Sequence, residues 1–222
     1  MATGIDFSRL MREEKRKARL QRKQHTKDDE SVSSSTPTKA QSIKKLPAWS
    51  CKNGPLSFDG LNLQLICSQP KSIFYSKRSL NDTKAVEDWL SLLPSGDSGL
   101  GEWKTMQFGK RRVAMFGESQ DSPLVGPLEE ISQLLVSKGV FSADEPPNHV
   151  LLNEYQPSQG ILPHTDGPSY SSRTATISLC SSVVLEFTKR LSTNEIGTNH
   201  SGVGTIQVLL EPGSLIVFED SA

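Results

Sequence analysis

The sequence predicts an α+β chain that is mainly β, and three observations lead to this class. Three segments in the second half are rich in Val, Ile, Leu and Phe, as half-buried strands are. Two earlier segments space their apolar residues along one face of a helix. Residues 1–45 are too polar to bury a core. Several short strands separated by turns indicate a sandwich or a barrel, although these strands are too few to close one.

The N-terminal 45 residues combine a basic segment with a polar linker. They hold 12 Lys and Arg against 6 Asp and Glu, a net charge of +6, whereas the rest holds 13 against 19, a net charge of −6. Residues 5–24 are dense in helix formers, and residues 28–42 are rich in Ser and Thr. The basic cluster at 16–23 is either a solvated charged face or a nuclear-import or RNA-contacting arm. The second interpretation places the protein in the nucleus as well as in the cytoplasm.

Composition also argues against several classes of protein. The chain has three cysteines and no CxxC pair, which disfavours a disulfide framework and a structural zinc site. No apolar run is long enough to span a membrane, and the N-terminus has no apolar signal region. A basic arm on an acidic body does not fit a protein that grips duplex DNA with a whole face. We expect an intracellular monomer without membrane contact, whose nucleic-acid contacts are local.

The folded part begins near Leu46, and residues 46–148 are expected to form a helical and hairpin support region. Residues 82–94 and 122–141 are the two amphipathic helices, the second of which stops at Gly139. Residues 102–117 indicate two short strands that form a hairpin.

From His149 onwards the pattern changes to strands. Residues 149–155, 174–188 and 205–219 are strand-like, and the last segment contains a turn at residues 211–214. Cys180 lies within an apolar run, so we expect it in the core.

Four residues in and after the first of these strands carry the chemistry. Asn153 and Tyr155 lie in the strand, and His164 and Asp166 follow it after a turn. Alternate residues of an extended backbone point to one face, so His164 and Asp166 could reach one ion together. An imidazole and a carboxylate are two thirds of the two-His, one-carboxylate set that holds non-haem Fe(II). The alternative is a turn that happens to contain a histidine, because an HxD pair alone is common.

The spacing of these residues resembles a known family. Asn153-x-Tyr155, followed by His164-x-Asp166 and a Gly-Pro pair, resembles the core motif of the AlkB-like Fe(II)/2-oxoglutarate dioxygenases. Within that family the chain is similar to the branch called AlkB homologue six. The similarity covers about the last 120 residues, starting near Trp103.

The resemblance implies a fold and an activity. The fold is a double-stranded β-helix, or jelly-roll, which residues 149–222 would form in part. His164 and Asp166 would bind Fe(II), while Asn153 and Tyr155 would hydrogen-bond the co-substrate 2-oxoglutarate. The activity implied is oxidation by O2 with decarboxylation of 2-oxoglutarate, most often of an N-methyl group on a nucleobase of RNA or DNA. We expect no catalytic residues beyond the metal ligands.

Three further residues are candidates for substrate contact. Arg111 and Arg112 lie on the hairpin and could touch phosphate, or they could belong to a solvated hairpin tip. Tyr170 could stack on a substrate base near the metal, or it could be an ordinary surface tyrosine.

The sequence also departs from the family pattern. The family has a second iron-binding His and an Arg that pairs with the 2-oxoglutarate carboxylate, and both should follow the strand that ends at Phe218. His200 and His149 are weak substitutes for the missing His. We therefore expect a C-terminally truncated chain with an incomplete fold, an unpaired edge on strand 205–219 and impaired iron binding and turnover. The alternative function is a non-catalytic isoform or fragment that binds nucleic acid or protein.

Overall fold

The structure, a computed structural model, describes six segments of the chain: residues 46–68, 71–107, 110–117, 123–164, 170–188 and 205–220. Nine strands and two helices lie in these segments, so the predicted α+β, mainly β class is confirmed. Neither of these helices has the length and apolar character needed to cross a membrane. The predicted basic segment and linker, residues 1–45, lie outside the described residues.

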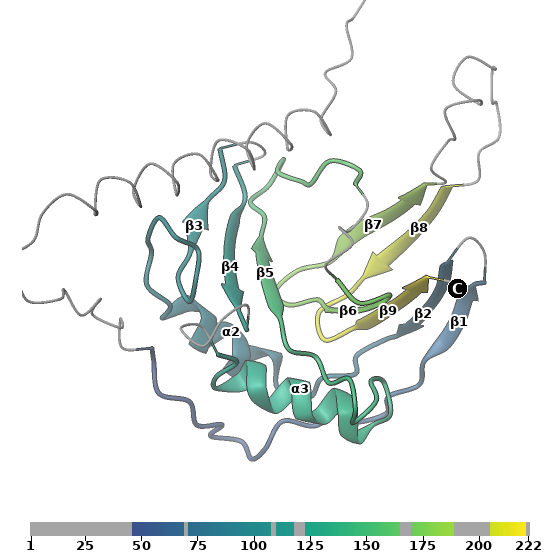
Figure 1. The fold of residues 1–222 in the computed structure, drawn as a ribbon, viewed down its shortest axis with the longest axis horizontal. Helices are drawn as coiled ribbons and strands as arrows, with labels where there is room; N and C mark the ends of the chain where they lie inside the picture. Colours follow the sequence, from purple (N-terminus) through teal and green to yellow (C-terminus); the bar gives the residue numbers. More distant parts are fainter. Residues whose placement is uncertain are drawn as a thin grey trace, which may run out of the picture. The chain divides into compact units, whose positions relative to one another are not determined.

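The largest sheet has four antiparallel strands in the order β1-β2-β9-β6 (Figure 1). Its strands are β1 (Gln64–Cys67), β2 (Lys71–Ser76), β9 (Leu215–Asp220) and β6 (Arg173–Ile177). β9 pairs along its length with β2 on one side and with β6 on the other. The expected unpaired edge is therefore wrong for β9, because β2, which the sequence analysis did not predict, supplies a neighbour.

Two smaller sheets complete the arrangement. β3 (Lys104–Thr105), β4 (Arg112–Phe116) and β5 (Val150–Glu154) form a three-stranded antiparallel sheet. β7 (Val183–Thr188) and β8 (Thr205–Leu210) form a two-stranded one. The predicted hairpin is confirmed, because Lys104 pairs with Val113 and Thr105 with Arg112.

One long bent hairpin connects the four-stranded and two-stranded sheets. The predicted strand 174–188 is divided into β6 and β7, and the predicted turn at 211–214 separates β8 from β9. At the bend, the Gly213 N–H donates to the Ser178 carbonyl at 2.8 Å, and the Ser178 N–H donates to the Ser214 carbonyl at 3.1 Å. These bonds continue the strand pairing from the pair of β6 and β9 into the pair of β7 and β8. Cys180 lies at the bend and is exposed, so its predicted place in the core is wrong.

Both predicted helices are confirmed, with shorter bounds. α2 (Thr83–Ser91) begins after Asp82, whose Oδ1 accepts the Ala85 N–H at 3.0 Å as an N-cap. α3 (Pro127–Ser137) begins with a proline, whose missing N–H costs nothing at that position. It ends before Gly139, whose φ of 70° is the left-handed conformation expected after a helix.

The first three residues of β9, Leu215 to Val217, are buried, and together they cover both faces of the strand. On one face Leu215 packs with Val86 of α2 and Leu135 of α3. On the other face Ile216 packs with Val208 of β8. A strand covered on both faces is continuously apolar rather than alternating, as the sequence of β9 is at its start.

The helices also support the smaller sheet that contains β4 and β5. Ala114 and Phe116 of β4 pack with Trp89 of α2 and Leu128 of α3, and Leu152 of β5 joins this cluster. Because side chains alternate along a strand, the intervening residues of β4 and β5 point to the opposite face.

Candidate functional site

The predicted co-substrate residues lie on the face of β5 that points away from the helices. Leu152 packs on the core, so its neighbours Leu151 and Asn153 point the other way, and both are exposed. Tyr155 directly follows the strand, two residues after Asn153. The alternation, continued one step past the strand, places Asn153 and Tyr155 on one face.

Arg111 joins Asn153 across the strand pair. The register of β4 and β5 pairs Val113 with Asn153 and Arg112 with Glu154. Arg111, immediately before β4, donates its Nε–H to Asn153 Oδ1 at 3.0 Å. The structure thus connects a residue predicted for substrate contact with one predicted for co-substrate binding. Sequence reasoning missed this contact, because it depends on a register between residues far apart in the chain.

Tyr155 is close enough to Arg111 to experience its charge. Tyr155 is 36% exposed to solvent. Partial burial raises the pKa of its hydroxyl above the ordinary value of 10.0, and the positive charge of Arg111 works in the opposite direction. A tyrosine hydroxyl is protonated at neutral pH with either an ordinary or a raised pKa, so Tyr155 can donate a hydrogen bond.

Arg112 points to the other face of the same sheet. Its guanidinium forms two hydrogen bonds with the Glu154 carboxylate, one of which joins Nε to Oε1 at 3.2 Å. The guanidinium carbon also lies 5.0 Å from the centre of the Trp103 ring. The structure does not bring Arg112 together with Asn153 and Tyr155, although Arg112 is adjacent to Arg111 in the sequence.

His164 ends the described segment that follows β5. It is exposed, and its Nδ1 lies 2.8 Å from the Leu162 carbonyl oxygen. A carbonyl oxygen can only accept, so a hydrogen bond here requires a proton on Nδ1. Asp166 lies outside the described residues, so the predicted convergence of its carboxylate with His164 stays a prediction.

The outcomes for the remaining predicted residues, Tyr170 and His200, also differ. Tyr170 is 49% exposed, and its ring centre lies 5.6 Å from that of His149 at a tilt of 41°. His200 lies outside the described residues. Within the described part of the chain, no group of three His, Cys, Asp or Glu side chains is placed to hold a metal ion.

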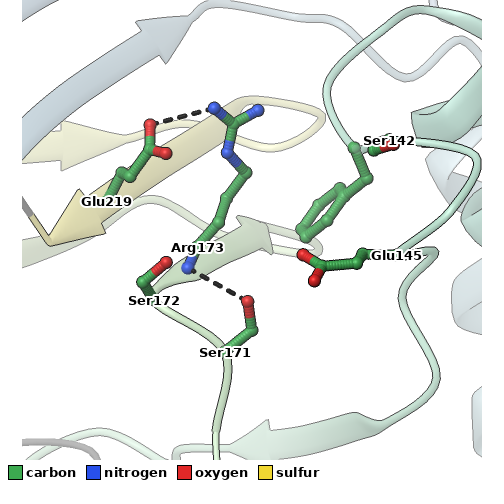
Figure 2. Close-up of a pocket in the computed structure, with 7 residues that line it drawn as sticks. Ser142, Glu145, Ser171, Ser172, Arg173 and Glu219 are labelled. Carbon is green, nitrogen blue, oxygen red and sulfur yellow. Dashed lines mark hydrogen bonds and ion pairs between the residues drawn. The ribbon is translucent and has the colours of Figure 1, made fainter. Parts of the chain in front are cut away.

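A polar cavity that the sequence analysis did not anticipate lies beside β6 and β9. It has a volume of about 240 Å³, and it is lined by Phe141, Ser142, Glu145, Ser171, Ser172, Arg173 and Glu219. Arg173 Nη2 lies 2.9 Å from Glu219 Oε2, and Glu145 faces the pair from a separate loop (Figure 2). The guanidinium also donates to the Val140 carbonyl. Because Arg173 already has these two partners, we interpret it mainly as a tie between β6, β9 and the loop after α3.

Comparison with known proteins finds similarity over part of the chain. The chain is 33% identical over 95 residues to the protein named "Probable RNA/DNA demethylase ALKBH6" of Danio rerio. The aligned part is 42% of this chain, and it spans only 40% of the length of that relative. No protein-family model matches the chain.

Proposed function

We propose that this chain represents an AlkB-like Fe(II)- and 2-oxoglutarate-dependent dioxygenase that demethylates an alkylated nucleobase of RNA or DNA. The observation that carries the proposal is the similarity over 95 residues to a protein named a probable RNA/DNA demethylase. The motif formed by Asn153, Tyr155, His164 and Asp166 agrees with it, because each residue type suits the role that the family motif gives it.

The described half of the proposed metal pair fits iron. His164 and Asp166 would hold Fe(II) through an imidazole and a carboxylate, which are ligands of non-haem iron. The Nδ1 of His164 contacts the Leu162 carbonyl, and this kind of hydrogen bond would hold the ring so that Nε2 could bind the metal. When bound, iron and 2-oxoglutarate supply the oxidation of a C–H bond by O2.

The face that carries Asn153 and Tyr155 fits the co-substrate. A side-chain amide and a protonated tyrosine hydroxyl both donate hydrogen bonds, and the carboxylates of 2-oxoglutarate accept them. Tyr170 follows Asp166 by four residues and is exposed, so we propose it as a stacking partner for the substrate base. We also propose that the protein acts in the nucleus and the cytoplasm.

We also propose that the strands belong to a jelly-roll core. The support is the bent hairpin, in which the pair of β6 and β9 lies in one sheet and the pair of β7 and β8 lies in another. Apolar residues such as Ile216 and Val208 fill the space between the two sheets. Paired strands that cross from one sheet to a facing sheet are the repeating unit of jelly rolls.

The first experiment measures metal binding directly. Anaerobic calorimetry with Fe(II) compares the chain with His164→Ala and Asp166→Ala, and Asp144→Ala serves as the matched control because Asp144 is an exposed acid outside the site. We expect each site variant to weaken Fe(II) binding by about tenfold or more, because one protein ligand is lost. Equal affinity of the chain and both site variants would contradict the metal assignment.

The second experiment measures the reaction. The chain is incubated with Fe(II), ascorbate, 2-oxoglutarate and N-methylated single-stranded RNA or DNA, and formaldehyde release is quantified. Because we expect impaired turnover, the release should be weak, but it should depend on 2-oxoglutarate and be lost in His164→Ala. Oligonucleotide binding without consumption of 2-oxoglutarate would instead favour the non-catalytic binding module.

A further inference from the structure

The face of β4 and β5 that carries Asn153 presents a concentration of hydrogen-bond donors. Arg111 immediately precedes Arg112 of β4, Tyr155 immediately follows its partner Glu154 of β5, and Asn153 lies one position further into β5. Arg111 contacts Asn153 directly, and its charge acts on Tyr155. A guanidinium, an amide and a phenol are therefore gathered on one side of the sheet.

The contact with Arg111 determines which end of the Asn153 amide is available. A side-chain amide has an oxygen that accepts and an NH2 group that donates, and only its hydrogen bonds decide which way it points. Arg111 has donors and no acceptor, so the group that faces it must be Oδ1. This leaves the Nδ2 hydrogens directed away from Arg111 and available to a ligand.

The remaining groups on this face share the same polarity. The planar guanidinium of Arg111 carries further N–H donors besides Nε, and Tyr155 donates its hydroxyl hydrogen. The neighbouring carboxylate of Glu154 points to the other face, where Arg112 and the Gln156 side chain donate to it. Donors combined with a positive charge complement a ligand that only accepts hydrogen bonds and is negative, as a carboxylate is.

We propose that Arg111 positions the Asn153 amide and adds a cation to the carboxylate site that the proposed function assigns to Asn153 and Tyr155. The inference rests on the proposed function for the ligand, 2-oxoglutarate, and for the roles of Asn153 and Tyr155. Arg111 thus supplies, from the hairpin before β4, a cationic partner for a ligand carboxylate. It acts both as a charge and as the group that holds Asn153 in its donating orientation.

The test measures direct binding of 2-oxoglutarate without iron, and ligand-observed NMR detects the binding. Arg111→Gln removes the charge, and Arg112→Gln is the matched control, because it changes the adjacent arginine on the opposite face. We expect Arg111→Gln to weaken binding by about tenfold or more, and Arg112→Gln to leave it within about twofold. Arg111→Lys should restore only part of the affinity, because it keeps the charge but loses the planar fork. An equal loss in the two glutamine variants would overturn the proposal.

A second variant tests the orientation of the amide without touching Arg111. Asn153→Asp keeps an acceptor for the Arg111 Nε–H, but it replaces the Nδ2 donor by a negative oxygen. We expect this variant to fold with unchanged thermal stability or better and to lose 2-oxoglutarate binding. In 15N-labelled protein, the side-chain NH2 signal of Asn153 should shift on addition of 2-oxoglutarate, and Arg111→Gln should move the same signal in the ligand-free protein. Binding by Asn153→Asp equal to that of the unchanged chain would overturn the proposal, as would an Asn153 signal that is insensitive to Arg111→Gln.

Two further probes define the ligand. The dimethyl ester of 2-oxoglutarate lacks both charges and should not bind, whereas inorganic phosphate should bind more weakly than 2-oxoglutarate. Phosphate binding as tight as that of 2-oxoglutarate would overturn the carboxylate assignment. Arg111-dependent binding without any turnover would contradict the proposed function while supporting this site. Turnover by the chain, together with unchanged 2-oxoglutarate binding in Arg111→Gln, would support the proposed function and contradict this site.

Discussion

Arg112 and Glu154 face each other across β4 and β5 and form a two-pronged ion pair on the side of the sheet opposite Asn153. The Arg112 guanidinium also lies over the Trp103 ring, on the side where the helices pack. The two faces of this strand pair therefore differ in role. One face carries the ion pair that joins β4 to β5, and the other carries the candidate site.

The first prediction concerns the stability of this ion pair. Glu154→Gln should lower the free energy of unfolding by about 0.5–1 kcal/mol, because the Arg112 and Glu154 side chains are 40% and 31% exposed and water screens their attraction. Arg112→Ala should cost more, since it also removes the packing against Trp103. Urea unfolding of both variants and the double variant gives the coupling energy, and a coupling of zero would contradict the pairing.

The second prediction concerns Gly117, which follows β4. Its φ is 88°, and a Cβ at this position would lie 1.9 Å from the Asn148 carbonyl oxygen. Gly117→Ala should therefore destabilise the fold by about 2 kcal/mol or more, because a strained backbone adds to a clash with main chain that cannot rotate away. Gly160→Ala is the control, since no heavy atom lies within 4 Å of its added Cβ. Equal midpoints for the two variants in thermal unfolding would show that the close approach is wrong.

The third prediction concerns the pH dependence given by Asp82. The Ala85 N–H, followed by the Asn53 side chain, lowers the pKa of the Asp82 carboxyl below its ordinary value of 3.8. A lowered folded-state pKa contributes stability that is fully present above 3.8 and is lost as the pH falls through the folded-state value. Asp82→Ala should cost about 1 kcal/mol at neutral pH and less at acid pH. A cost that does not change between neutral pH and pH 3 would contradict the effect.

The fourth prediction compares two tyrosine hydroxyls. The hydroxyl of Tyr75 is buried and has no hydrogen-bond partner among the described residues, so Tyr75→Phe should leave stability unchanged or raise it by about 1 kcal/mol. Tyr155→Phe should leave stability nearly unchanged but weaken 2-oxoglutarate binding by roughly three- to tenfold, because one donor to the ligand is lost. Chemical denaturation and the NMR titration check the two effects separately. Weaker 2-oxoglutarate binding in Tyr75→Phe than in Tyr155→Phe would contradict the location of the site.

The sequence by itself determined the local elements. The spacing of apolar residues located α2 and α3, and Gly139 marked the end of α3. The turn at 211–214 and the hairpin at 102–117 were also predictable, because turn residues and short apolar runs act over a few positions. The spacing of Asn153, Tyr155, His164 and Asp166 was also readable from the chain, and the structure describes the first three of these residues.

Only the tertiary structure decided which distant segments pair. β9 has β2 as a neighbour, although long stretches of chain separate the two strands, and no local pattern in either sequence specifies that choice. The register of β4 against β5 decided that Arg111 contacts Asn153 while Arg112 contacts Glu154. A shift of one residue would exchange the two arginines between faces, because side chains alternate strictly along a strand. Register depends on the packing of the whole sheet against the helices, so it lies beyond what a pattern along the chain can determine.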